Sequence, residues 1–136
     1  RCGFDRRQYS RYAVNWLASI MHKSGGDGEI FHDNLDDISM GGAGIYSDTD
    51  IYSEKSLVML IETPLPSSYG KTSKIITGIE CGLCKPVFLE ERQQFRTGVQ
   101  FLRFHGIDKH LLAEALFTQH KAASRRNQEA AAGVHI

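Results

Sequence analysis

The sequence predicts a mainly β protein, a small antiparallel β-barrel with one C-terminal α-helix packed against it. The first observation is a series of short segments in which apolar residues recur at every second position, separated by turn-forming residues. This is the pattern of half-buried strands. The second observation is a change to helical spacing after Gly106. Several short strands followed by one helix indicate a barrel whose opening the helix covers.

The strands expected in the first half lie on either side of a glycine-rich turn. Apolar residues alternate over 12–21, which predicts the first strand. The turn is expected at 25–28 (GGDG), and a second extended segment follows over 29–39. A third strand includes Ile45. The continuous apolar run at 57–61 predicts a further strand, buried on both faces.

The second half begins with a long connection. Residues 63–74 contain prolines, a glycine and several serines and are expected to form it. Alternating residues then predict strands over 75–83 and 95–101, with Arg96 available to face water.

The end of the chain is expected to be helical and then flexible. Apolar residues at helical spacing predict a helix over 107–117. Residues 122–136 are polar and alanine-rich, and we expect them to form a frayed tail or to make contacts outside the domain. The 136 residues are enough for one domain with its own core, which we place at residues 1–121.

Composition excludes several classes of function. Sixteen basic and sixteen acidic residues cancel, so the chain has no overall basic field for nucleic acid or an anionic membrane. No apolar run approaches the roughly 20 residues of a membrane span. Three cysteines and no secretory signal indicate a reducing compartment rather than a disulfide framework. An anionic ligand would therefore need a local cluster of cations.

Such a cluster lies near the start of the chain, where Arg6, Arg7 and Arg11 follow one another closely. Arginine offers a planar fork that matches phosphate oxygens and the guanine edge, and a flat face that stacks on a purine. The alternative interpretation is a solvated charged segment. The spacing Arg-x-x-x-Arg is unspecific by itself, because Arg92 and Arg96 are a second match.

A second motif, Asp-x-Ser-x-x-Gly, occurs once, at residues 37–42. An ionised Asp37 could accept hydrogen bonds from guanine N–H groups, and Ser39 could donate to a phosphate. Gly41 and Gly42 are expected to supply positive φ and to let the backbone approach a ligand. Alternatively, Asp37 and Ser39 are turn residues that bond to their own backbone.

The two motifs in this order resemble the PilZ domain, the bacterial receptor for cyclic di-GMP. The resemblance covers roughly residues 4–120, because residues 98–101 (GVQF) and the helix at 107–117 are similar to the last strand and closing helix of that family. It implies a six-stranded, Greek-key-like barrel and a non-enzymatic receptor. It also implies a cytoplasmic bacterial protein, or a cytosolic domain of a larger one.

The resemblance implies a ligand site made of the residues Arg6, Arg7, Arg11, Asp37, Ser39 and Gly42. Gly42 would leave room for cyclic di-GMP, and no metal or other cofactor is expected. An arginine at position 6, before the core of the motif, is associated in the family with an intercalated dimer of the ligand. Ligand binding would order residues 1–11 against the barrel and change what the domain presents to a partner protein or an adjoining domain. Motility, biofilm formation, exopolysaccharide synthesis, adhesion and virulence are all outputs of this family.

Features of the sequence bear on several other functions. A PilZ-like scaffold that works through protein contacts without nucleotide is the main alternative. Binding of single-stranded nucleic acid would need a basic groove with exposed aromatic residues. Cys81 and Cys84 have the spacing of a metal or redox pair, but a structural zinc site needs four ligands. No catalytic set of Ser, His and Asp or of Cys and His has a recognisable nucleophile turn, so catalysis is not expected.

Overall fold

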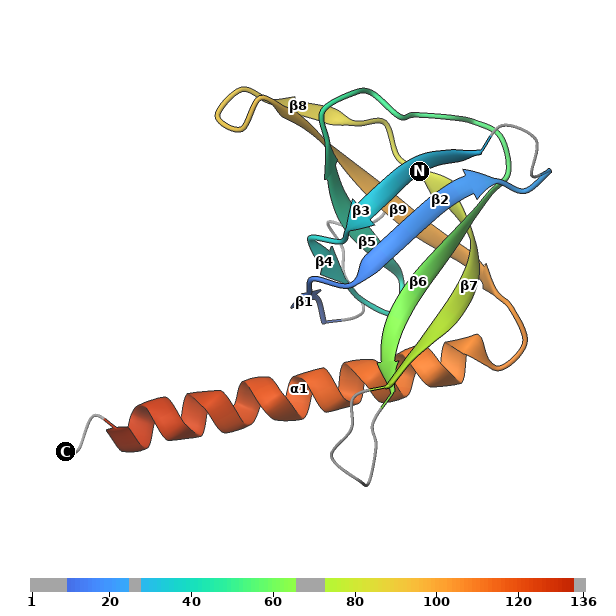
Figure 1. Cartoon of the computed structure of the whole chain (residues 1–136). Coiled ribbons are helices and arrows are strands. Elements are labelled where there is room, and N and C mark those ends of the chain that lie inside the picture. The colour runs from blue at the N-terminus through green and yellow to red at the C-terminus, as the bar shows by residue number, and fades with distance from the viewer. Residues whose placement is uncertain (1–9, 25–27, 66–72, 134–136) are drawn as a thin grey trace.

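The computed structural model describes residues 10–24, 28–65 and 73–133. An antiparallel sheet curls around a core, and one long helix crosses an end of it (Figure 1). The elements in chain order are β1 Tyr12–Ala13, β2 Leu17–His22, β3 Glu29–Asn34, β4 Asp37–Ile38, β5 Gly42–Ser47, β6 Leu57–Leu65, β7 Ser73–Leu83, β8 Val87–Leu89, β9 Gln94–Phe104 and α1 Asp108–Gly133.

Short segments of the chain connect the two edges of the sheet to each other. Their order is β1-β4-β5-β9-β7-β6-β2-β3, and β8 pairs with β9. β1 and β2 lie far apart in this order but are joined by three residues, and β3 and β4 by two. Two backbone hydrogen bonds join these two connections to each other, from Val14 N to Asp36 O (3.3 Å) and from Leu35 N to Trp16 O (2.9 Å). The sheet is thereby curled into a nearly closed barrel.

The predicted fold class is confirmed. Six of the strands in the described part of the chain have six or more residues, namely β2, β3, β5, β6, β7 and β9. The segments 12–21 and 29–39 are not single strands as predicted, because each bends where it passes from one end of the sheet to the other. The alternation of buried residues nevertheless continues across the first bend, through Trp16, Ala18 and Ile20.

The strand β6 differs from its prediction in two ways. It is not buried on both faces, since Leu57, Met59 and Ile61 are buried while the residues between them are partly exposed. It also extends to Leu65, and β7 begins at Ser73, so the predicted connection at 63–74 is strand at both ends. Residues 66–72 lie outside the described part. The strand continues because its pairing with β7 extends to Leu65, opposite Ser73. Inside the barrel, the hydroxyl groups of Thr63 and Thr77 form a hydrogen bond of 2.9 Å.

The helix α1 covers one end of the barrel with its first turns. Leu112, Ala115 and Leu116 are buried against the sheet. The Asp108 carboxylate accepts a hydrogen bond from Gly78 N at 2.8 Å, which ties the helix start to β7. The predicted residue Ile107 is not part of this contact, because it precedes the helix and is exposed.

The helix continues beyond its contact with the barrel (Figure 1). Its backbone runs to Gly133 and so includes most of the segment that the sequence led us to expect as a tail. Over the described ranges, no helix is both long and apolar enough to cross a membrane.

Candidate functional site

The carboxylate of Asp37 lies at the centre of a group of charged residues on the outside of the barrel. Its Oδ1 accepts a hydrogen bond from Arg11 Nη1 at 2.7 Å, and its Oδ2 accepts one from Arg96 Nη2 at 3.0 Å. Asp37 is in β4, whereas Arg11 precedes β1 and Arg96 is in β9. The fold therefore brings together one residue from each predicted motif, as the resemblance implied, and adds a third from the other half of the chain.

Arg96 lies on the outer face of the sheet, as predicted, but its side chain is only partly exposed. Its second guanidinium nitrogen, Nη1, donates to Asp36 Oδ2 at 3.0 Å, so one arginine bridges two neighbouring carboxylates. Burial would lower the pKa of Arg96, but the charge of Asp37 and the hydrogen bonds that Arg96 donates to both carboxylates raise it overall. Arg96 is thus a fixed cation whose fork is already occupied by protein.

Gly44 makes this ion pair possible. It lies opposite Asp37 in the β4–β5 pairing and opposite Gly98 in the β5–β9 pairing. A Cβ atom on Gly44 would be 2.4 Å from Arg96 Nη2 and 2.8 Å from Asp37 Oδ1. No side chain fits there without displacing the Arg96 fork.

The sequence contains a signal for Arg96 but none for Gly44. Alternation along β9 puts Arg96 on the face opposite to the buried residues Thr97 and Val99. Arg96 also belongs to the second Arg-x-x-x-Arg match in the sequence. Pairing of β9 with β5 could not be deduced from the sequence, so neither residue could be connected with Asp37.

Ser39 supports the turn that follows Asp37. Its side chain is buried, its Oγ accepts a hydrogen bond from Gly41 N at 3.1 Å, and its Oγ donates to Gly42 O at 3.4 Å. Ser39 N also donates to Gly42 O, at 2.8 Å. The alternative role foreseen for Ser39, that of a turn residue, is the one its contacts have in this structure.

The two glycines of the motif have no positive φ, contrary to our expectation. Among the described residues, the glycines with positive φ are Gly28 and Gly106. Gly42 begins β5 and pairs with Gln100, while Gly41 O accepts a hydrogen bond from Phe101 N at 3.0 Å. These contacts hold the turn against β9.

Two of the predicted ligand residues, Arg6 and Arg7, lie outside the described residues. Of the other four, Arg11 and Asp37 are in direct contact, and Ser39 and Gly42 form the adjacent turn. Arg11 is only 10% exposed and Asp37 21%, so this ion pair is shielded from solvent more than an ordinary surface pair.

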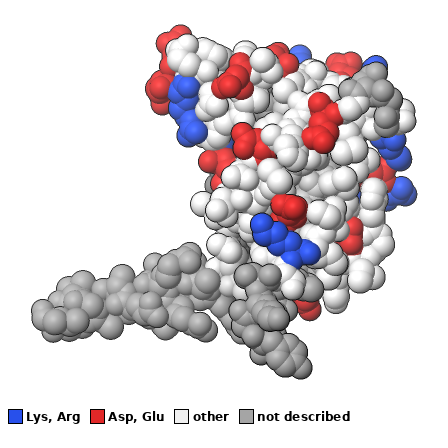
Figure 2. All heavy atoms as spheres, in the orientation of Figure 1, with Lys and Arg blue, Asp and Glu red and all other residues white. Residues whose placement is uncertain are grey.

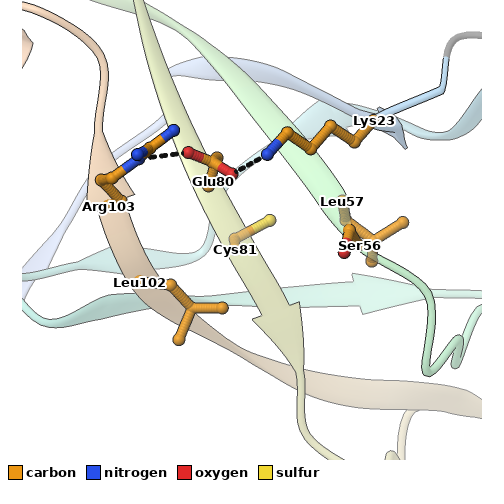
Figure 3. Close-up of a pocket in the computed structure, with 7 residues that line it drawn as sticks. All are labelled: Lys23, Ser56, Leu57, Glu80, Cys81, Leu102 and Arg103. Carbon is orange, nitrogen blue, oxygen red and sulfur yellow. Dashed lines mark hydrogen bonds and ion pairs between the residues drawn. The ribbon is translucent and has the colours of Figure 1, made fainter.

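A pocket of about 300 Å³ on another part of the barrel contains none of the predicted site residues (Figure 3). Glu80 lies between Lys23 and Arg103 and forms ion pairs with both. The hydrogen bond from Lys23 is the main cause that lowers the pKa of Glu80. Cys81 lines the same pocket as a buried free thiol. Within the described ranges, no three His, Cys, Asp or Glu residues gather as metal ligands would.

Comparison with known proteins gives matches at the level of structure. No family model and no curated protein sequence matches the chain. The inhibitor of motility MotI/DgrA of Bacillus subtilis superposes over 85% of this chain and 52% of its own, with a TM-score of 0.64 and 17% identity. MrkH of K. pneumonia, solved as a complex with c-di-GMP, superposes over 89% of this chain and 55% of its own, with a TM-score of 0.58 and 18% identity.

The chain spans about half the length of each of these two structures. At such low identity the likeness concerns the fold. It agrees with the resemblance that the two motifs indicated in the sequence, and the motif residues Arg11 and Asp37 meet on the outside of this barrel. The chain has the fold of a PilZ domain.

Proposed function

We propose that this domain is a non-enzymatic receptor for cyclic di-GMP. The observation that carries the proposal is the meeting of Arg11 and Asp37, one from each motif, on a barrel similar to MrkH, which was solved with c-di-GMP. A carboxylate that accepts two N–H donors from arginines has the geometry to accept two N–H donors from a guanine edge. Arg6 and Arg7 supply further cations for the phosphates in this proposal.

Binding is an exchange of partners at Asp37. Without ligand, Arg11 occupies Oδ1 and Arg96 occupies Oδ2. A guanine that takes the place of Arg11 frees that guanidinium for a phosphate oxygen or the base edge, so the Coulomb energy lost at Asp37 is recovered at the ligand. Arg96 stays in place because its other nitrogen remains on Asp36. The network thereby holds Asp37 ready for the ligand.

Displacement of Arg11 by a ligand would also affect the helix α1, through the neighbouring residue Tyr12. Tyr12 follows Arg11 directly, pairs with Ile38 of the motif turn, and its hydroxyl lies 3.3 Å from His120 Nδ1 of α1. The two rings also meet edge to face, with centroids 6.1 Å apart. Displacement of Arg11 would therefore alter the contact between β1 and α1. The long helix is the element through which we expect a partner protein or an adjoining domain to sense the ligand.

Two molecules of ligand per chain is the stoichiometry we propose, because a third guanidinium at Arg6 can stack on a second nucleotide. The competing function is a scaffold of the same fold that binds a protein without nucleotide.

Hydrogen exchange with and without cyclic di-GMP tests receptor and transmission together. The receptor predicts slower exchange at residues 37–46, and transmission predicts a change in α1 as well. Asp37→Ala is the matched control and abolishes both effects. Protection at 37–46 with an unchanged helix would keep the receptor and reject transmission. Unchanged exchange throughout at a saturating nucleotide concentration would reject the receptor in favour of the scaffold.

A further inference from the structure

Next to the Asp37 site, Arg92 lies over the aromatic ring of Tyr46. The guanidinium carbon of Arg92 is 3.7 Å from the centre of the Tyr46 ring, which is stacking distance. The guanidinium carbon of Arg96 is 5.2 Å from the same ring. Tyr46 is the β5 partner of Arg96 in the sheet. The ring therefore connects Arg92 directly to the network around Asp37.

The turn that carries Arg92 is held by contacts on both sides. Gln94 Nε2 donates to Asp48 Oδ1 at 3.1 Å, which ties the start of β9 to the residue after β5. Phe88 and Phe95 pack edge to face across the β8–β9 hairpin, with centroids 5.1 Å apart. Arg92 is thus positioned before any ligand arrives, which lowers the entropy cost of using it.

The charge of Arg92 has different surroundings from the charges of the two arginines at Asp37. Arg11 and Arg96 both have carboxylate partners. Arg92 is exposed, and in the described part of the chain no ion pair with a carboxylate forms at its guanidinium. The neighbouring Glu90 and Glu91 are exposed on the same turn, so its contribution as a bare charge is offset. What remains is a flat cation with one face on a ring and the other toward solvent.

We propose that Arg92, supported by Tyr46, is a stacking subsite for a purine base of the ligand bound at Asp37. This inference rests on the proposed function, since the ligand is the same cyclic dinucleotide. A guanine at Asp37 presents its edge to the carboxylate, while a second base can stack on the outer face of Arg92. Guanidinium groups stack on purines, whereas an ammonium group offers only a point charge.

Titration calorimetry of cyclic di-GMP with single variants of the full chain tests the subsite. Arg92→Lys keeps the charge and removes the flat face, so stacking predicts that it weakens binding about tenfold, nearly as much as Arg92→Ala does. Tyr46→Leu removes the support and has a similar effect, and Tyr46→Phe keeps wild-type affinity. Arg103→Ala is the matched control, because Arg103 is an exposed arginine near the other end of β9.

The outcomes separate this subsite from the proposed function. Loss with both Arg92 variants and Tyr46→Leu, at unchanged melting temperature and with a normal Arg103→Ala, supports stacking. Wild-type affinity in Arg92→Lys, or in both Arg92 variants, overturns the subsite while Asp37→Ala still establishes the receptor. A wild-type chain that binds no cyclic di-GMP overturns the receptor and the subsite with it.

Discussion

Asp37 and Gly44 form a pair whose roles depend on each other. The carboxylate is useful to a ligand only if it is held in place, and Arg96 holds it through a fork that passes over Gly44. The end of an arginine side chain moves easily, so a methyl group on Gly44 displaces Arg96 more readily than it distorts the sheet. The cost of losing Gly44 should therefore appear in binding rather than in folding.

Gly44→Ala is expected to weaken binding of cyclic di-GMP severalfold while the free energy of unfolding falls by only about 1 kcal/mol. Gly82→Ala is the matched control, because a Cβ there would have Leu102 Cδ1 at 3.8 Å as its nearest neighbour. In an Arg96→Ala background the additional effect of Gly44→Ala should be much smaller. Equal effects in both backgrounds, measured by calorimetry and urea unfolding, would mean that Gly44 does not act through Arg96.

Because of Cys81, the free energy of unfolding of the barrel is expected to depend on pH in the alkaline range. Burial raises the pKa of its thiol from 9.0 to about 12. The folded state therefore keeps a proton that the unfolded chain loses, so the stabilising contribution is complete below pH 9 and declines as pH rises toward 12. Between pH 8 and pH 10 the wild type should lose about 1.4 kcal/mol more than Cys81→Ala. Parallel losses in urea unfolding under reducing conditions would contradict a neutral buried thiol.

At the scale of elements, the start of α1 is where the helix is fixed to the sheet. Asp108 satisfies Gly78 N of β7 and also puts a negative charge in the first turn, where the helix dipole favours it. The helix extends past the barrel at its other end (Figure 1). The position of α1 therefore depends strongly on this residue and on the buried residues one turn later.

Asp108→Ala is expected to lower the free energy of unfolding by about 1–2 kcal/mol, since it removes a charged acceptor from a buried N–H group. Asp108→Asn should lose less because its amide oxygen can still accept. Glu114→Ala, an exposed change in the same helix, should stay within about 0.5 kcal/mol of wild type. Denaturant unfolding measures all three, and an Asp108→Ala variant as stable as Glu114→Ala would contradict the anchoring role.

At the scale of the whole molecule, alternation in the sequence predicted the fold class because it records which face of each strand is buried. It did not predict the bend at 14–16, since a bend that keeps the alternation leaves no trace in the pattern. At 35–36 the buried positions pass from Leu35 to Ile38, but a single shift of this kind does not show where the strand bends. The residues Arg11 and Asp37 could be proposed because the two motifs are local. Arg96 and Gly44 could not, because their role arises from the pairing of β9 with β5.

Charge on the whole molecule agrees with a site that is local. Acidic and basic side chains are interspersed on the visible face, without a large area of one sign (Figure 2). Long-range attraction of a polyanion is therefore weak. Recognition of a small dianionic ligand must come from arginines at the site, and its affinity should decline only moderately with salt.

The measurement that tests the central claim most directly is titration calorimetry of the full chain with cyclic di-GMP, beside Arg7→Ala and Asp37→Ala. The receptor predicts micromolar or tighter binding near two nucleotides per chain, with binding lost in both variants. One nucleotide per chain would keep the receptor and reject the role of Arg6. A folded wild-type chain that releases no heat and shows no binding would contradict the account.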